Sequence, residues 1–126
     1  MPATDYSPGA GDVPIEVGGA TYVLRPTLEA ALAISRQFGG IREAMSRVNS
    51  LDLDAVVSVI RAGMGTAEAR KIKNLEAVIW GGGLLSGNGE LILGCVNFLI
   101  YLANGGRPSE GSDGGEVADG NPTTQQ

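Results

Sequence analysis

The feature that most constrains this chain is the apolar run LILGCVNFLIYLA at residues 91–103, in which only Asn97 is clearly polar. A membrane-spanning helix needs about 20 residues, so a run this short does not predict a membrane span. A helix that is apolar on nearly every side must instead be covered on nearly every side. Either the other helices of a bundle surround it, or a partner chain covers one of its faces. The sequence leaves both arrangements open, and they do not exclude each other.

The composition of the two ends of the chain limits how much of it is expected to fold. A chain of 126 residues is expected to form one domain. Residues 1–13 and 105–126 are rich in Gly, Pro, Ser and acidic residues and offer little to bury, so both are predicted to be flexible. The predicted domain therefore covers residues 14–104, large enough to fold alone around a modest core.

The net charge of −5 is located in the flanking segments. Residues 14–104 contain eight basic and eight acidic side chains and are neutral. Double-stranded nucleic acid is bound mainly through neutralised phosphates, so a neutral domain with an acidic tail argues against such a partner. An acidic tail more often favours solubility or repels wrong partners.

A β-hairpin is expected near the N-terminus. Two short β-favouring segments, residues 15–17 and 21–25, flank Gly18 and Gly19, and glycine readily adopts the positive φ of a tight turn. Thr27 follows the second segment and is a suitable N-cap for the next element.

Helical spacing of apolar residues then predicts helices over about 27–38, 41–49, 52–63 and 66–80, followed by the apolar helix at 91–103. The predicted fold is mainly α: a short N-terminal β-hairpin, a small bundle of four to five helices and a disordered acidic C-terminal tail. The residues expected to face the core are Leu28, Ala31, Leu32 and Phe38 in the first helix, Ile41, Ala44, Met45 and Val48 in the second, Leu53, Val56, Val57 and Ile60 in the third, and Ala69, Ile72, Leu75 and Ile79 in the fourth.

The side chains that carry most enzyme chemistry are scarce. The sequence contains no histidine, which removes the commonest general base, the Ser-His and Cys-His nucleophile pairs, and most zinc sites. The carboxylates are scattered beside basic residues, as in the i,i+4 pair Glu43 and Arg47. The single cysteine, Cys95, lies in the apolar run and is expected to be a buried structural thiol. We therefore predict a protein that is not an enzyme, with no catalytic residue, metal or cofactor.

Two segments bear some likeness to motifs that bind phosphate or DNA. The glycine-rich residues 81–89 follow no strand and lack the Lys-Ser/Thr pair of a phosphate-binding loop, so a hinge between helices is the better interpretation. Helices at 52–63 and 66–80 would also fit a helix-turn-helix motif, with three basic residues on the recognition helix, Arg70, Lys71 and Lys73. Two glutamates within the same helix and the neutral domain argue against DNA binding.

Residues 15–30 (IEVGGATYVLRPTLEA) resemble the opening of the tail assembly chaperones of siphophages and gene transfer agents, whose members are often labelled phage tail tube or gene transfer agent family proteins. Members share two short strands around a glycine turn, the sequence Leu-Arg-Pro-Thr, and a helix that opens with an apolar residue and Glu. The likeness continues through the Gly-Gly pair at 39–40, the Arg-Ala-Gly at 61–63 and, more weakly, to residue 104. The glycines at 81–83 and the loop at 87–89 depart from the family pattern.

The resemblance implies an assembly chaperone that binds the tape-measure protein and recruits tail tube subunits to it, with homo-oligomers possible. Alternatives are a permanent structural component of the tail and a small helix-turn-helix regulator. The chain opens without a signal-peptide pattern, so the bacterial host cytoplasm is the expected location, with neither nucleic acid nor membrane as a partner. The residues predicted to bind the partner are Trp80, Leu91, Val96, Phe98, Leu99, Tyr101 and Leu102.

Overall fold

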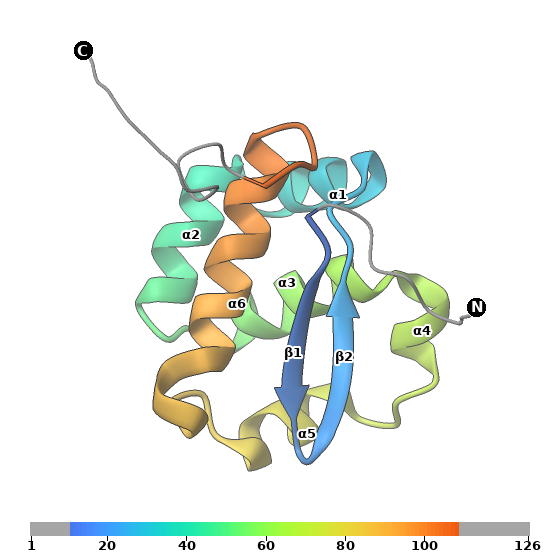
Figure 1. Cartoon of the computed structure of the whole chain (residues 1–126), viewed down its shortest axis with the longest axis vertical. Helices are drawn as coiled ribbons and strands as arrows, with labels where there is room; N and C mark the ends of the chain where they lie inside the picture. Colours follow the sequence, from blue (N-terminus) through green and yellow to red (C-terminus); the bar gives the residue numbers. More distant parts are fainter. Residues whose placement is uncertain (1–10, 109–126) are drawn as a thin grey trace.

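The computed structural model describes residues 11–108. It is mainly helical with an N-terminal hairpin, as predicted, whereas the acidic residues 109–126 lie outside the described part (Figure 1). The elements in chain order are β1 (Val13–Val17), β2 (Ala20–Leu24), α1 (Leu28–Phe38), α2 (Ile41–Asn49), α3 (Leu53–Met64), α4 (Thr66–Arg70), α5 (Leu75–Gly82) and α6 (Ser86–Ala103).

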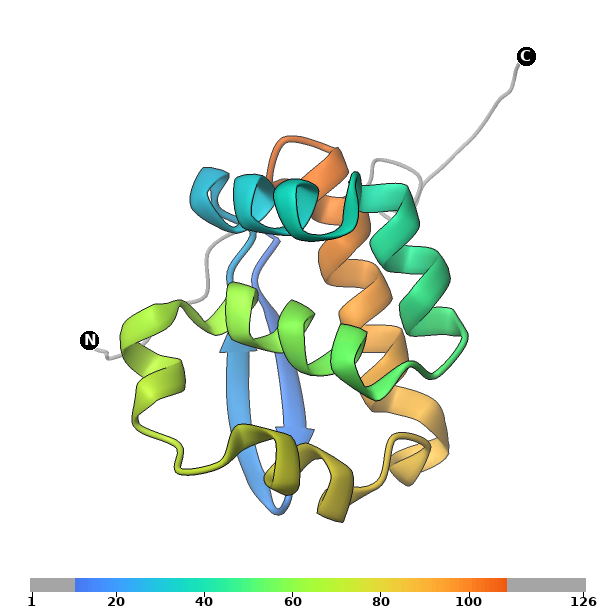
Figure 2. The same cartoon turned by 180° about the vertical axis from the view of Figure 1, so that it is seen from behind.

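The hairpin lies at the centre of the arrangement. α6 runs beside β1 with α2 next to it, and α3 crosses behind the strands (Figures 1 and 2). α1 covers one end of the hairpin and α5 covers the other (Figure 1). The two ends of the fold therefore present different helices to solvent.

The turn of the hairpin lies at Gly18 and Gly19, as predicted. β1 and β2 are antiparallel, with Val17 opposite Ala20, and both turn residues have positive φ, 59° at Gly18 and 84° at Gly19. Alternate residues of β1 are buried beneath the helices, as a strand with one covered face requires. The first of them is Val13, so the folded region begins one residue before the predicted boundary at 14.

α1 has the predicted limits but presents a different face to the core. The Thr27 hydroxyl accepts a hydrogen bond from the Ala30 N–H at 3.1 Å, and Gly39 ends the helix at φ 81°. The prediction that Leu28 and Leu32 face the core is wrong, because their side chains are 76% and 41% exposed. Apolar residues occupy two faces of this helix. The face that packs against the rest of the domain is not the one that carries Leu28 and Leu32. Its buried members are Ala30, Ile34 and Phe38.

The helix predicted over 66–80 is two helices. Asn74 adopts a left-handed conformation at φ 59°, and its side-chain oxygen accepts a hydrogen bond from the Ala77 N–H at 3.3 Å, which starts α5. α4 is only five residues long, so Lys71 and Lys73 lie in the turn that follows it. The described residues thus hold six helices rather than four or five, and the recognition helix of the helix-turn-helix hypothesis is not formed.

α6 is the central helix of the core. It packs against α2, β1, α3 and α1, and Cys95, Phe98 and Leu99 are fully buried. Gly94 permits close contact with β1, since an added Cβ would lie 2.8 Å from the Ile15 Cγ2. Cys95 is buried, as predicted, and this burial raises the pKa of its thiol to about 12.

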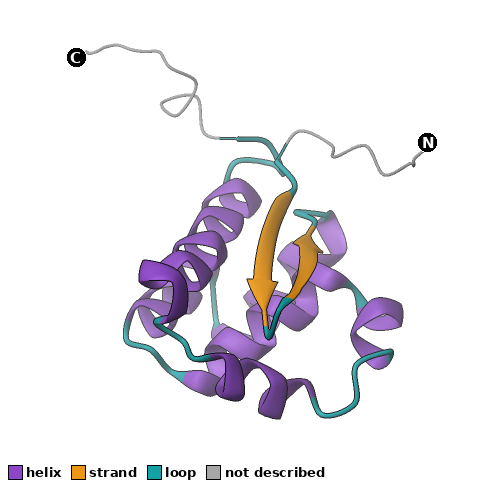
Figure 3. Cartoon of the chain, turned by 60° about the horizontal axis from the view of Figure 1, so that its bottom comes forward, coloured by secondary structure: helices purple, strands orange, loops and turns teal. Residues whose placement is uncertain are grey.

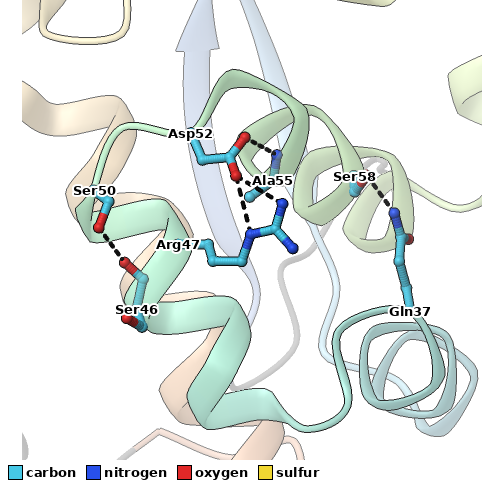
Figure 4. Close-up of polar contacts among 7 residues, drawn as sticks. All are labelled: Gln37, Ser46, Arg47, Ser50, Asp52, Ala55 and Ser58. Carbon is cyan, nitrogen blue, oxygen red and sulfur yellow. Dashed lines mark hydrogen bonds and ion pairs between the residues drawn. The ribbon is translucent and has the colours of Figure 1, made fainter.

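An ion pair joins the end of α2 to the start of α3 (Figure 4). The Arg47 Nη2 and Nε donate to the Asp52 Oδ2 at 2.8 and 3.0 Å, and the Asp52 Oδ1 accepts from the Ala55 N–H at 3.3 Å. Asp52 thereby serves as the N-cap of α3. The predicted pair of Glu43 with Arg47 is replaced by this contact.

Stability should fall in acid partly because of Asp52. The hydrogen bond from Arg47, followed by that from Ala55, lowers the pKa of Asp52 below its ordinary value of 3.8. A lowered folded-state pKa contributes stability above the ordinary value, and this contribution is lost as the pH falls through the folded value. In Asp52→Asn the cap remains but the charge is gone. Urea denaturation from pH 7 down to pH 2 should therefore show a weaker acid dependence in the variant, and equal dependence would contradict the assignment.

Candidate partner-binding surfaces

The seven residues predicted to bind a partner differ in how far they are buried. Leu91, Phe98, Leu99 and Leu102 are buried within the chain, so their assignment to a partner surface is wrong. The face of α6 that carries them is covered by β1, α2 and α3. Val96 and Tyr101 are partly buried against the core, and Trp80 is 71% exposed.

The opposite side of α6 keeps an open strip. Leu93, Asn97 and Ile100 follow one another at i, i+4 and i+7; Leu93 is 58% exposed and the other two are half-buried. The sequence left open whether this helix is covered by its own chain or by a partner. In the structure its own chain covers most of it. The open strip is the part that remains accessible to a partner.

Three large apolar side chains are exposed on α5, on the connection to α6 and on α6 itself: Trp80, Leu85 and Leu93. Leu75 and Ile79 face the core, which turns Trp80 outward, and Leu85 in the connection is 62% exposed. We name Trp80, Leu85 and Leu93 the corner surface. Leu85 and Leu93 were missed in the sequence; the signal for Leu93 was its position on α6 opposite the buried series.

One acidic residue accompanies Trp80 on the outer face of α5. Glu76 lies one helical turn before Trp80, and Arg61 of α3 approaches it at 3.4 Å (Nη2 to Oε2). A backbone hydrogen bond at Glu76 itself and then the side-chain hydrogen bond from Arg61 lower the pKa of this carboxyl group. The corner surface is therefore bordered by a carboxylate that stays ionised at neutral pH and is already paired.

A second apolar surface lies on α1. Leu28 and Leu32 are one turn apart and exposed, and we name them the α1 surface. Leu32 also lines a groove of about 630 Å³ between α1 and the α3–α4 segment. Near one end of this groove the Gln37 Nε2 donates to the Ser58 Oγ at 2.8 Å, which links α1 to α3 (Figure 4). The charged side chains that line the groove are Arg25, Glu29, Arg36 and Arg61.

Other routes to a function are not apparent in residues 11–108. No group of three or more Cys, Asp or Glu side chains in that range is placed to hold a metal ion. No helix in the same range is long and apolar enough to cross a membrane. Comparison of the chain with known protein families, curated proteins and solved structures finds no significant match.

Proposed function

We propose that this chain is an assembly chaperone of a phage-like tail, which binds the tape-measure protein and brings tail tube subunits to it. The resemblance of residues 15–30 to that family motivates the proposal, and a mainly helical fold behind an N-terminal hairpin is in keeping with it. The observation that carries the proposal is the presence of two exposed apolar surfaces on different elements, the corner surface and the α1 surface.

The placement of the two surfaces suits a protein that bridges two partners. α1 lies at one end of the fold, whereas α5 and the start of α6 lie at the end that comes forward in Figure 3. Two partners bound at opposite ends would not compete for space. A single continuous patch would instead favour one partner or self-association.

The corner surface is assigned to the tape-measure protein. A long helical protein with an exposed apolar stripe is recognised by apolar side chains that pack along one helix face. Tryptophan is among the residue types most enriched at positions that contribute most of the binding energy, and Trp80 is largely exposed. The smaller α1 surface, with two leucines, is assigned to the tube subunit.

Paired surface variants test the two assignments. Trp80→Ser with Leu93→Ser should weaken binding of the tape-measure protein by roughly 30-fold or more, since a single residue that dominates an interface contributes about 2 kcal/mol or more. Leu28→Ser with Leu32→Ser is the matched control and should leave that binding unchanged while reducing capture of the tube subunit. Both pairs are at least partly exposed and should keep the wild-type circular dichroism spectrum. The measurements are the soluble yield of co-expressed tape-measure protein and its affinity by calorimetry.

Two results would overturn the proposal. One is a tape-measure protein that is equally soluble without this chain. The other is a stoichiometric amount of this chain in purified particles by mass spectrometry, which would make it a permanent tail component.

A further inference from the structure

A second hollow extends the groove beside α1. The groove of about 630 Å³ is lined by α1 and the α3–α4 segment, and a hollow of about 310 Å³ is lined by residues of α3 and α4. Both are lined by Arg61 and Thr66, so they form one continuous depression. It lies on the side of the fold that carries α1, α3 and α4, which faces the viewer in Figure 2. We name this depression, which is lined by Arg25, Arg36, Arg61 and Arg70, the arginine trough.

Basic side chains are concentrated in this trough. Of the eight basic and eight acidic side chains in residues 14–104, four arginines line it, whereas Glu29 is the one acidic residue that does. The arginines come from different segments: Arg25 follows β2, Arg36 lies on α1, Arg61 on α3 and Arg70 on α4. Separate elements therefore bring positive charge together in a domain that is neutral as a whole.

Two of the four arginines are unpaired. Arg36 and Arg70 are exposed and form no ion pair with any residue of the range 11–108. The other two have acidic partners: Asp12 for Arg25 at 3.7 Å and Glu76 for Arg61 at 3.4 Å. Arg61 makes this contact through its Nη2, and a guanidinium group has five N–H donors, so Arg61 can also bind a further carboxylate.

The trough also has an apolar part. Leu32 and Ala33 on α1 are exposed, and Ala62 on α3 is half-buried. A ligand that fits the trough therefore combines negative charge with apolar side chains.

The lining favours a peptide over a nucleic acid. None of the lining residues that the structure describes is aromatic, so the trough lacks the side chains on which bases of a single strand stack. A nucleic acid would satisfy the arginines alone. An acidic peptide with apolar side chains would satisfy both the arginines and the apolar part.

We propose that the arginine trough binds an acidic peptide segment of a partner protein. Its carboxylates bind at Arg36, Arg61 and Arg70, and an apolar side chain packs against Leu32 and Ala33. Carboxylate groups match the fork of a guanidinium group and form charge-assisted hydrogen bonds with it. The chemistry of the ligand follows from the trough alone and does not depend on the proposed function.

Fluorescence anisotropy of the full chain with three labelled probes tests the proposal. The first probe is a glutamate-rich peptide that carries two leucines, the second has serine in place of both leucines, and the third is a single-stranded oligonucleotide of the same net charge. At low salt the first should bind more tightly than the other two by about tenfold or more, because only it buries apolar side chains. Its binding should weaken at about 1 M NaCl, where the screening length is about 3 Å.

Two matched pairs of variants locate the site. Arg36→Glu should weaken binding of the leucine-containing peptide by about tenfold, since a hydrogen bond between charged groups is lost and a repulsion is added. Arg42→Glu makes the same charge change on exposed α2 outside the trough and should leave the affinity nearly unchanged. Leu32→Ser should weaken the same binding, whereas Leu28→Ser, one turn earlier on α1 and outside the trough lining, should not. All four side chains are exposed, so the variants should keep the wild-type circular dichroism spectrum.

The proposal fails if the leucine-containing peptide does not bind at low salt, or if Arg36→Glu and Arg42→Glu change its affinity equally. Equal binding of the serine peptide or of the oligonucleotide would also contradict it, and the latter result would indicate a nucleic-acid surface. A dimer that Arg36→Glu dissociates would place a second copy in the trough instead. None of the probes is a tail protein, so their failure to bind would leave the partner assignments of the corner surface and the α1 surface unaffected.

Discussion

Replacing Phe98 with alanine is expected to lower the free energy of unfolding by about 3–5 kcal/mol, because the ring is fully buried in the core and its removal leaves a cavity. Small domains have a total stability of roughly 5–15 kcal/mol, so the variant should lose a large part of its stability. Urea denaturation followed by circular dichroism measures the effect.

The control for this prediction lies on the same helix. Leu93→Ala removes an exposed side chain from α6, so its effect should stay within about 0.5 kcal/mol. Equal effects of the two substitutions would show that α6 does not bury the face described here. Leu99→Asp tests the burial of the same face of α6. It would place a carboxylate at a fully buried position and unfold the domain.

Two glycine substitutions should change stability in opposite directions. At Gly63 in α3 an added Cβ would lie 2.9 Å from the Leu24 Cβ and 3.1 Å from the Phe98 Cζ, so Gly63→Ala should destabilise by about 1–3 kcal/mol. At Gly81 in α5 an added Cβ meets nothing within 4 Å and the φ is not positive. Gly81→Ala should stabilise by up to about 1 kcal/mol, since alanine favours the helix.

Thermal and urea denaturation of the two alanine variants measure these changes in stability. The Leu24 Cβ is fixed by the backbone of β2, so the contact at Gly63 cannot be relieved by a rotamer change alone. The Arg25 N–H donates to the Gly63 carbonyl oxygen at 2.9 Å, which holds α3 close to the end of β2. A stabilised Gly63→Ala variant would contradict this close approach.

Local signals in the sequence predicted much of the secondary structure. Gly18 and Gly19 form the turn, Thr27 caps α1, and Gly39 ends it, because each of these features depends on a few neighbouring residues. The apolar run was correctly predicted to be a helix. The break at Asn74 was missed, although an asparagine that can accept a hydrogen bond from the N–H three residues later is itself a local signal.

Which faces are buried was decided by the tertiary structure. Leu28 and Ile34 are both apolar and both helical, yet only Ile34 is buried, because burial depends on where distant segments pack rather than on the residue itself. The same holds for Leu91 and Leu93 on α6. The sequence by itself determined that an apolar helix had to be covered. The positions of β1, α2 and α3 decided that the chain covers most of this helix and leaves Leu93 exposed.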